Sequence, residues 1–269
     1  MEKDKKIGLA LGSGAARGLA HIGVLEVLER EKIPIHFIAG TSMGALIGGF
    51  YASGSGIKEL KEFAYQTDWK KVAILFSPSP SRSGLVNGKR IEKLLRSFLG
   101  NRKIEELPIP FSCVATDILS GEEVIINKGD LVDAIMASIS IQGIFSPFIR
   151  DGKVLCDGGI VNPVPVDIVK KMGADFVIAS VINSSPKKIE EEKNSKSREE
   201  TKIPSIFTII LQSIDIMQKK IINNSLSEAD LIISSETSDI KLLEFYRAKE
   251  AVEAGRKAAK EALKKIKNE

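Results

Sequence analysis

The first fifty or so residues alternate between short apolar runs and helix-like segments, and this alternation restricts the fold more than any other feature. Residues 6–11 (KIGLAL) predict a buried strand, and residues 17–31 predict a helix with apolar residues at a spacing of three. Residues 34–39 (PIHFIA) predict a second strand, which leads through GTSMG into the small-residue helix ALIGGFYASG. Strands that alternate with helices in this way are typical of a parallel sheet with right-handed crossovers. The sequence therefore predicts an α/β fold.

The remaining chain continues the alternation without an internal repeat. Further strands are predicted over 111–117, 122–127, 153–157, 175–182 and 231–235. Further helices are predicted over 56–66, 88–99, 130–138, 163–172, 204–222 and 244–266. The helix over 204–222 is apolar on nearly every side, so we expect it to lie in the core. Helices on both faces of a mostly parallel sheet make a three-layer sandwich, and we expect residues 5–266 to form it as a single domain.

Residues 184–202 (SSPKKIEEEKNSKSREETK) differ from the rest of the chain because their only apolar side chain is that of Ile189. Such a segment cannot bury enough apolar surface to offset the entropy that it loses on ordering. We predict a charged, mobile loop here, with a flap near the mouth of a site as the alternative.

Composition excludes several functional classes. The 39 basic and 35 acidic side chains give a net charge of +4, too small and too evenly spread to indicate a nucleic-acid partner. The cysteines, Cys113 and Cys156, show no CxxC spacing and suit a reducing interior as buried thiols. MEKDKK followed by IGLALGSGAA superficially resembles a signal peptide, but its acidic residues and the continuing pattern favour a strand. No apolar run reaches the roughly 18 residues of a membrane span, so we expect a cytoplasmic protein whose membrane contact is at most peripheral, at the inner surface.

Gly12, Gly14 and Gly18 form a glycine-rich turn after the first predicted strand. Their pattern, G-x-G-x-x-x-G, is one residue longer than the dinucleotide fingerprint. That fingerprint also needs an acidic residue at the end of the second strand, where this chain has Gly-Thr-Ser. A dinucleotide-binding oxidoreductase is therefore the less favoured alternative.

The second predicted strand leads instead into a G-x-S-x-G pentapeptide, Gly40 to Gly44, with Ser42 at its centre. An apolar strand before it and a small-residue helix after it match the elbow on which a nucleophilic serine is pushed outward. Glycines are needed on both sides because a larger side chain would collide with the neighbouring strand and helix. We therefore predict that Ser42 is a nucleophile, which needs a base to take its proton.

The base for Ser42 is not a histidine in the usual hydrolase order, because both His21 and His36 precede the serine. His36 lies in an apolar strand and is expected to be a hydrogen-bonded core residue. His21 lies near the glycine turn and remains an alternative base or a hydrogen-bonding residue. Among the carboxylates, Asp151 opens an Asp-Gly hairpin turn, whereas Asp157 ends a predicted strand and precedes two glycines. Asp157 is therefore the better candidate for a carboxylate that points into a cleft.

Four blocks, GSGAARGLAHIGVL, GTSMG, ASISIQGIFSP and DGGIVNPVPVD, together resemble the patatin-like phospholipase family, in particular its bacterial members. The blocks follow the family's order and cover roughly residues 7–170. The resemblance implies a modified α/β-hydrolase sheet and a lipid acyl hydrolase that uses a Ser-Asp dyad without histidine. Carried over to this chain, Ser42 is the nucleophile, and Asp157 in the DGG block is its proton acceptor.

The resemblance also gives the glycine turn the role of an oxyanion hole. Its donors would be the backbone N–H groups of Gly12, Ser13, Gly14, Ala15 and Met43. The supporting members of the motifs are Arg17, Gly18, Gly40, Gly44, Gly158 and Gly159. Arg17 orients the loop or attracts an anionic head group, or else it forms a surface ion pair. Ser13, Ala15 and Gln142 stand where many members have glycine or proline, which leaves the pocket shape open.

We therefore expect a serine acyl hydrolase that cleaves carboxylic esters of fatty acids, with lysophospholipids or phospholipids as substrates. The apolar helix over 204–222 is then a candidate wall of an acyl pocket. No cofactor and no metal are expected, because His, Cys and carboxylate residues do not cluster with ligand spacing. A catalytically silent lipid-binding or regulatory protein is the main alternative.

Overall fold

The structure is a computed structural model that describes residues 5–66, 86, 88–183 and 206–268. Its sheet has eight strands, paired in the order β5-β6-β3-β2-β1-β7-β8, with β4 also paired to β3. The strands are β1 (Ile7–Leu11), β2 (Phe37–Thr41), β3 (Phe111–Asp117), β4 (Glu123–Ile126), β5 (Phe148–Arg150), β6 (Lys153–Asp157), β7 (Phe176–Asn183) and β8 (Leu231–Glu236).

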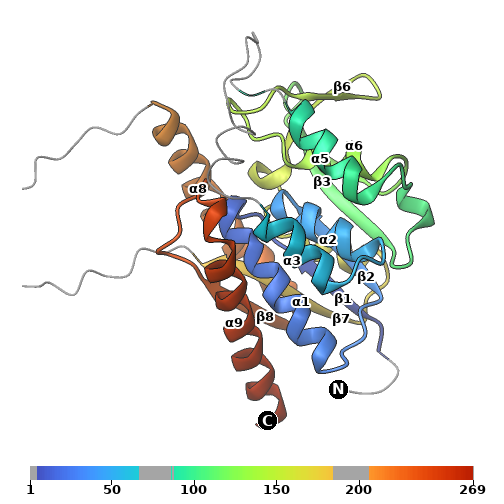
Figure 1. Ribbon diagram of the computed structural model, residues 1–269, viewed down its shortest axis with the longest axis vertical. Helices are drawn as coiled ribbons and strands as arrows, with labels where there is room; N and C mark the ends of the chain where they lie inside the picture. Colours follow the sequence, from blue (N-terminus) through green and yellow to red (C-terminus); the bar gives the residue numbers. More distant parts are fainter. Residues whose placement is uncertain (1–4, 67–85, 87, 184–205, 269) are drawn as a thin grey trace, which may run out of the picture.

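Helices cover the sheet, with α1, α2, α3 and α9 in front of it in Figure 1. The α-helices of the described residues are α1 (Ala20–Arg30), α2 (Met43–Ala52), α3 (Ile57–Tyr65), α5 (Lys89–Leu99), α6 (Leu131–Ser138), α7 (Val166–Lys171), α8 (Ile206–Ser225) and α9 (Ala248–Asn268). Short 3-10 turns are η1 (Ala15–Leu19), η2 (Ile104–Glu106), η3 (Gly158–Ile160), η4 (Leu226–Glu228) and η5 (Phe245–Arg247).

The sheet separates two hydrophobic cores because successive side chains of a strand point to opposite faces. On β1, Leu9 and Leu11 pack into the larger core with α1, α2 and α9. Ala10 points the other way, into a smaller core with Val166 and Val169 of α7. Strands β2, β1, β7 and β8 run parallel, as do β2 and β3, and β4, β5 and β6 join by antiparallel pairing. The predicted three-layer α/β fold with a mostly parallel sheet is confirmed.

Helices α1 and α9 cross with their backbones in contact. A Cβ atom added to Gly23 of α1 would lie 1.9 Å from the carbonyl oxygen of Val252. A Cβ atom added to Gly255 of α9 would likewise lie 1.9 Å from the carbonyl oxygen of Ala20. Because both obstacles are backbone atoms, this crossing requires glycine at both positions.

Strands β2 and β6 end head to head along one edge of β3. Thr41, the last residue of β2, pairs with Val114, and Asp157, the last residue of β6, pairs with Ala115. Val114 and Ala115 both pair with β4 as well, so β4 occupies the opposite edge of β3. Strand β2 runs parallel to β3 and β6 runs antiparallel to it, so the two strands approach each other and end in neighbouring rows.

Most element boundaries differ from the sequence prediction by one to four residues, and two of the differences lie close to the site. Strand β2 covers Phe37–Thr41 rather than 34–39, since its pairing with β1 begins at Phe37. The helix predicted over 17–31 is divided into η1 and α1. The predicted hairpin at Asp151 and Gly152 is confirmed: both have positive φ, 50° and 75°, between the antiparallel strands β5 and β6. The charged segment 184–202 lies outside the described residues.

The prediction that the helix over 204–222 lies in the core is wrong. Helix α8 projects at the upper left of Figure 1 and exposes several large apolar side chains, among them Ile206, Ile216 and Met217. Only one stripe of the helix packs against the rest of the chain, and Leu211 in that stripe is buried with Phe145 and Ile144. Apolar side chains occur on nearly every side of α8, but only those on one side of the helix are covered by the rest of the chain.

Candidate active site

Ser42 lies at the turn between β2 and α2, at the carboxyl end of the parallel strands where α/β sheets bind ligands. Its φ of 56° and ψ of −120° are rarely adopted by a residue with a side chain. The Ser42 N–H donates to Ser138 Oγ at 2.9 Å, and Ser138 Oγ donates to the Val114 carbonyl at 2.6 Å. The end of α6 therefore supports the turn that β2 and α2 form.

The two glycines of the pentapeptide allow this turn to pack. A Cβ atom on Gly40 would lie 2.4 Å from the carbonyl oxygen of Gly44, and one on Gly44 would lie 2.1 Å from that of Leu11. These obstacles are backbone atoms of the following helix and the neighbouring strand. The collision expected from the sequence is thus present at both positions.

Asp157 faces Ser42 across the ends of β6 and β2. Ser42 Oγ donates to Asp157 Oδ2 at 2.5 Å, and the Gly159 N–H donates to Asp157 Oδ1 at 2.8 Å. Both Ser42 and Asp157 are buried. Burial raises the pKa of Asp157 from its ordinary 3.8 to about 6, although the hydrogen bonds from Ser42 and Gly159 oppose the rise. The carboxylate is therefore ionised at neutral pH and more basic than an exposed aspartate.

His21 is fully buried and makes hydrogen bonds with groups other than Ser42. Its Nε2 lies 2.8 Å from the Gly12 carbonyl, and its Nδ1 lies 2.8 Å from Ser180 Oγ. Burial lowers the pKa of His21 to about 4, so the ring is neutral at pH 7. A carbonyl only accepts, so Nε2 carries the proton and the Ser180 hydroxyl donates to Nδ1. Both ring nitrogens of His21 are therefore used in these hydrogen bonds. His21 has the hydrogen-bonding role, and neither nitrogen is left to act as the base for Ser42. His36, half-buried, accepts from the Ile7 N–H at Nδ1.

The predicted oxyanion donors divide into two groups. The Gly12 N–H donates to the Ser180 carbonyl at 3.0 Å, and the Ser13 N–H donates to the Pro163 carbonyl at 2.8 Å. These two groups are therefore already used, which contradicts their predicted role as donors to an oxyanion. Among the described residues, no acceptor is found for the N–H groups of Gly14, Ala15 and Met43. Gly14, Ala15 and Ser42 line one hollow together with Asp157.

The glycine turn is attached to α8 by two side-chain contacts. Ser13 Oγ donates to Gln218 Oε1 at 2.7 Å. Arg17 donates from Nη1 to Asp215 at 3.2 Å and from Nε to the Ile240 carbonyl at 2.7 Å. Of the roles predicted for Arg17, loop positioning through a partly buried ion pair is the one that these contacts match.

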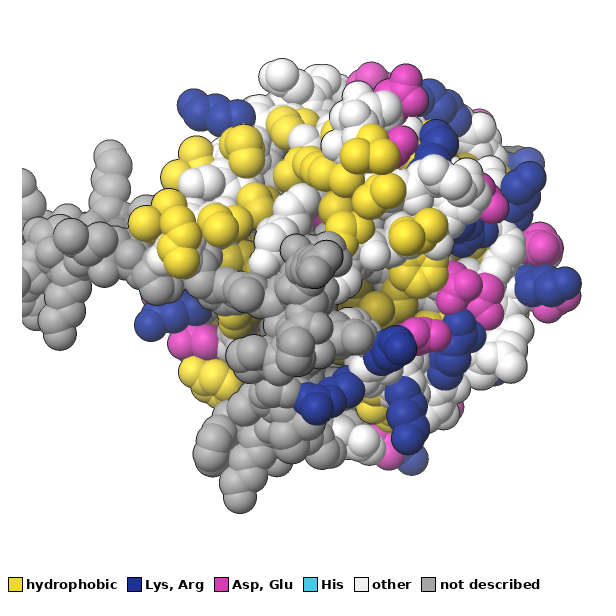
Figure 2. All heavy atoms as spheres, turned by 90° about the horizontal axis from the view of Figure 1, so that it is seen from above, with side chains coloured by type: hydrophobic (Ala, Val, Ile, Leu, Met, Phe, Trp, Pro, Cys, Tyr) yellow, Lys and Arg dark blue, Asp and Glu magenta, His cyan; other side chains and the backbone are white. Residues whose placement is uncertain are grey.

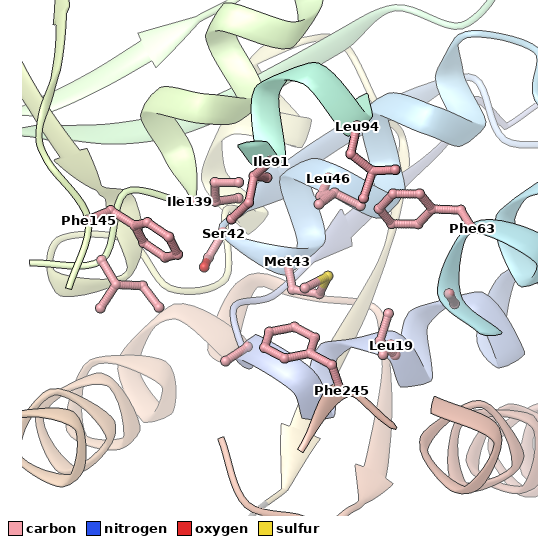
Figure 3. A pocket seen from close by; sticks show the side chains of 13 residues that line it. Leu19, Ser42, Met43, Leu46, Phe63, Ile91, Leu94, Ile139, Phe145 and Phe245 are labelled. Carbon is pink, nitrogen blue, oxygen red and sulfur yellow. The ribbon is translucent and has the colours of Figure 1, made fainter. Parts of the chain in front are cut away.

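An apolar pocket begins at Ser42, and neither Asp215 nor Gln218 is among the residues that line it. Figure 3 shows Ser42 beside Phe145, with Met43 and Leu46 leading to Phe63 and with Phe245 on the lower side. Ser42 is the single hydroxyl-bearing residue among the side chains that line the pocket. In the described part of the chain, no group of three or more His, Cys, Asp or Glu side chains is placed to hold a metal ion.

Ser42 and Asp157 lie within the part of the chain that matches a known protein family. The family model described as patatin-like phospholipase matches residues 9–170, which include the glycine turn, Ser42 and Asp157. The chain belongs to the patatin-like phospholipase family.

Several relatives of this patatin-like phospholipase domain are known. An uncharacterised NTE-family protein of Mycobacterium tuberculosis is 42% identical over 180 residues, which are 67% of this chain and 50% of the relative. A second NTE-family protein, from Mycobacterium bovis, is 29% identical over an alignment of 276 residues, covering 96% of this chain and 46% of the relative. Lysophospholipase NTE1 of Debaryomyces hansenii is 34% identical over 187 residues, 67% of this chain and 12% of that protein. The chain spans about half the length of its mycobacterial relatives.

A solved structure shares the fold. The crystal structure of VipD from Legionella pneumophila superposes with a TM-score of 0.53 at 16% sequence identity, covering 98% of this chain and 67% of that one. At this identity the likeness describes the arrangement of strands and helices, which is that of the patatin-like phospholipase domain.

Residues to which sequence reasoning gave no role in the site support both members of the Ser42–Asp157 pair. Ser138 accepts from the Ser42 N–H, as described above. Gln142 Nε2 and Thr116 Oγ1 each donate to the Asp157 carbonyl at 2.9 Å. Ser138 and Gln142 both belong to the ASISIQGIFSP block, so this third patatin-like phospholipase motif was the available signal. Gln142, at a position where proline is common, thereby supports the strand end that carries Asp157.

Proposed function

We propose that this protein is a serine acyl hydrolase that cleaves carboxylic ester bonds of lipids, with lysophospholipids or phospholipids as substrates. The observation that carries the proposal is the 2.5 Å hydrogen bond from Ser42 Oγ to Asp157 at one end of an apolar pocket. Membership of the patatin-like phospholipase family and the similarity to a lysophospholipase support the same substrate class.

In the first step, Asp157 takes the proton from Ser42 as Ser42 Oγ attacks the acyl carbonyl carbon. The pKa of about 6 supports this role, because the carboxylate is ionised at neutral pH and binds a proton more readily than an exposed aspartate. The proton travels along a hydrogen bond that already exists. No reorientation of either side chain is needed before the attack.

The negative charge that develops on the carbonyl oxygen needs hydrogen-bond donors. The N–H groups of Gly14, Ala15 and Met43 are the proposed donors, because each lies at the site and none donates within the described chain. Removal of one such donor from a hydrolase costs roughly 3 to 4 kcal/mol in the barrier. Gly12 and Ser13 act indirectly, since their hydrogen bonds to Ser180 and Pro163 fix the path of the turn.

The tetrahedral intermediate then breaks down with release of the alcohol, which leaves with the proton held by Asp157. The acyl group stays on Ser42 Oγ as an ester, with its chain in the apolar pocket lined by Leu46, Leu94 and Phe63. Water hydrolyses this ester when Asp157, again ionised, accepts a proton from the attacking water. The free fatty acid and the original enzyme result.

Labelling with a fluorophosphonate probe and hydrolysis of a fatty-acyl ester test the proposal. Ser42→Ala should abolish labelling, and both Ser42→Ala and Asp157→Asn should lower ester hydrolysis by at least a thousandfold. Ser53→Ala, a buried serine at the other end of α2, and Asp117→Asn, a buried aspartate at the end of β3, are matched controls that should remain active. Full activity of Ser42→Ala or of Asp157→Asn refutes the dyad.

The alternatives give different results in the same experiment. A catalytically silent lipid-binding protein would bind lipid but leave Ser42 unlabelled. A dinucleotide-binding oxidoreductase would bind NAD or NADP. Strand β2 ends at Thr41 and leads directly into Ser42, so the ribose-binding acid of that class is missing from its usual place.

A further inference from the structure

Helix α8 has two faces of different character. The inner face carries Leu211, Ile214, Asp215 and Gln218, which line the hollow that contains Ser42 and Asp157. Their spacing of three and four residues places them on one side of the helix. This face is the one through which Gln218 and Asp215 contact the glycine turn.

The outer face of α8 is an exposed apolar stripe, which we define as Ile206, Ile209, Ile210, Ile216 and Met217. Their exposed fractions are 72%, 42%, 38%, 59% and 50%. These positions recur with the helical period, and the exposed Ser213 lies between them on the same side. A stripe of five large apolar side chains on one helix face differs from the scattered single residues that soluble surfaces normally show.

The charges near the stripe are basic. The single carboxylate of α8 is that of Asp215, which is on the inner face and pairs with Arg17 and Lys219. Lys220 is exposed beside the stripe, and Lys219 is one residue earlier. The outer face thus combines apolar side chains with cationic groups and has no negative charge of its own, which suits an anionic partner.

Helix α8 is at the upper end of Figure 1, as is the β5–β6 hairpin. The hairpin carries Ile149, which is 75% exposed. Figure 2 looks onto this end of the molecule and shows hydrophobic side chains gathered over one part of the face, with Lys and Arg side chains around it and Asp and Glu side chains among them. An apolar area with Lys and Arg side chains nearby is found on surfaces that bind lipid head groups and the adjoining acyl chains.

We propose that α8 binds the surface of an anionic lipid bilayer through its outer apolar stripe, with Lys220 directed to the lipid phosphates. This inference rests on the proposed function, because the inner face of the same helix lines the hollow in which a lipid ester would be cleaved. No helix in the described part of the chain is long and apolar enough to cross a membrane. In the proposed docking, α8 lies in the plane of the interface with its apolar stripe toward the lipid, as amphipathic surface helices do.

Co-sedimentation with vesicles of equal parts phosphatidylglycerol and phosphatidylcholine tests this docking. The Ser42→Ala protein is used, so that lipid is not consumed and so that vesicle binding is measured apart from catalysis. Ile209→Glu and Ile216→Glu should each lower binding about tenfold, since each removes an isoleucine side chain from the lipid contact. The matched control is Ile232→Glu on β8, because Ile232 is 42% exposed, as Ile209 is. This control should bind as the parent does.

A fluorescent probe gives a second readout that does not depend on destabilising the helix. Cys113 and Cys156 are both buried, so an introduced cysteine can be labelled selectively. An environment-sensitive dye on Ser213→Cys, within the stripe, should shift to the blue when the anionic vesicles are added. The same dye on Lys264→Cys, exposed near the end of α9, should not shift. High salt and pure phosphatidylcholine vesicles should each weaken the response.

Three results would overturn the docking proposal. In the first, the Ser42→Ala protein does not bind the anionic vesicles. In the second, Ile209→Glu and Ile216→Glu bind as tightly as the parent and the Ser213→Cys dye does not respond. In the third, sedimentation equilibrium shows a dimer that Ile216→Glu dissociates, which would make a second copy of the chain the occupant. Failure of ester hydrolysis with vesicle binding intact would refute the proposed function alone.

Discussion

Replacing Asp157 by asparagine should stabilise the folded protein at neutral pH while it removes activity. Asp157 is buried, and the cost of burying its charge raises the pKa from 3.8 to about 6. A pKa difference of about two corresponds to about 3 kcal/mol of free energy. Asparagine has almost the same shape, and its amide oxygen can still accept from the Gly159 N–H. The variant therefore avoids most of this cost without leaving a cavity.

The pH dependence gives the sign of the effect. Below pH 3.8 the carboxyl is protonated in both folded and unfolded chains, and its burial costs little. As the pH rises from 3.8 to about 6, only the unfolded chain gains from ionisation, and wild-type stability falls; above the folded pKa of about 6 the loss levels off. The Asp157→Asn protein should thus be more stable than wild type by about 3 kcal/mol at pH 7.5 but by only about 1 kcal/mol at pH 4.5.

These differences in stability are measured by urea unfolding of both proteins at the two pH values, with far-ultraviolet circular dichroism as the signal for unfolding. Asp117→Asn is the control, because the Asp117 carboxylate accepts hydrogen bonds from the Leu119 N–H and the Ser120 hydroxyl that asparagine reproduces only in part. That variant should gain no stability. An Asp157→Asn protein with the same advantage at both pH values, or with none at pH 7.5, would refute the reasoning about the buried charge.

Three further outcomes follow from the same structure. The kcat/KM for a soluble ester should fall about tenfold per pH unit below pH 6, as Asp157 becomes protonated; a profile that stays flat to pH 4.5 would contradict this. His21→Gln should lower kcat/KM but leave the acid limb at the same pH, because His21 positions Gly12 rather than Ser42; loss of the limb would make His21 the base. Gly23→Ala should destabilise the protein by about 1 to 3 kcal/mol in urea unfolding, since the new Cβ would lie 1.9 Å from the Val252 carbonyl oxygen. Unchanged stability would show that α1 and α9 separate at little cost.

The fold and the pair Ser42–Asp157 could be predicted because their signals are local. A strand, a small-residue turn and a helix around Ser42 specify an elbow within about a dozen residues. Asp157 is recognised by its place at a strand end before two glycines. Both patterns can be recognised without knowing which strands are neighbours in the sheet. The four blocks that resemble the patatin-like phospholipase family support the same two residues.

The role of each N–H group in the glycine turn could not be predicted in this way. The acceptors that use the Gly12 and Ser13 N–H groups are the carbonyls of Ser180 and Pro163, which are far along the chain. The Ser180 carbonyl is brought there by the pairing of β1 with β7, and the Pro163 carbonyl comes from the segment between η3 and α7. Both are long-range contacts that no local pattern specifies. Sequence reasoning therefore treated the N–H groups of the turn as equivalent.

The environment of α8 was mispredicted for a different reason. Its apolar residues occur on both faces, and a hydrophobic pattern does not say whether a partner covers each face. In the structure Leu211 is buried, whereas Ile206, in the same helix, is largely exposed. The sequence offered an acyl-pocket wall as the second interpretation of this helix. Leu211 and Ile214 line the hollow that contains Ser42 and Asp157, but α8 contributes no residue to the apolar pocket proposed for the acyl chain.

The head-to-head meeting of β2 and β6 on β3 determines what this site can tolerate. A slip of β6 by a single residue along β3 would turn the Asp157 carboxylate to the other face of the sheet, away from the serine. Insertions or exchanges in the β3–β4 and β5–β6 turns should be harmless as long as Asp157 stays opposite Ala115 and Ser138 and Gln142 keep their contacts with the pair. A designer who grafts this pair of residues onto a shorter scaffold would need to preserve the backbone ladder of the sheet together with the turn at Ser42.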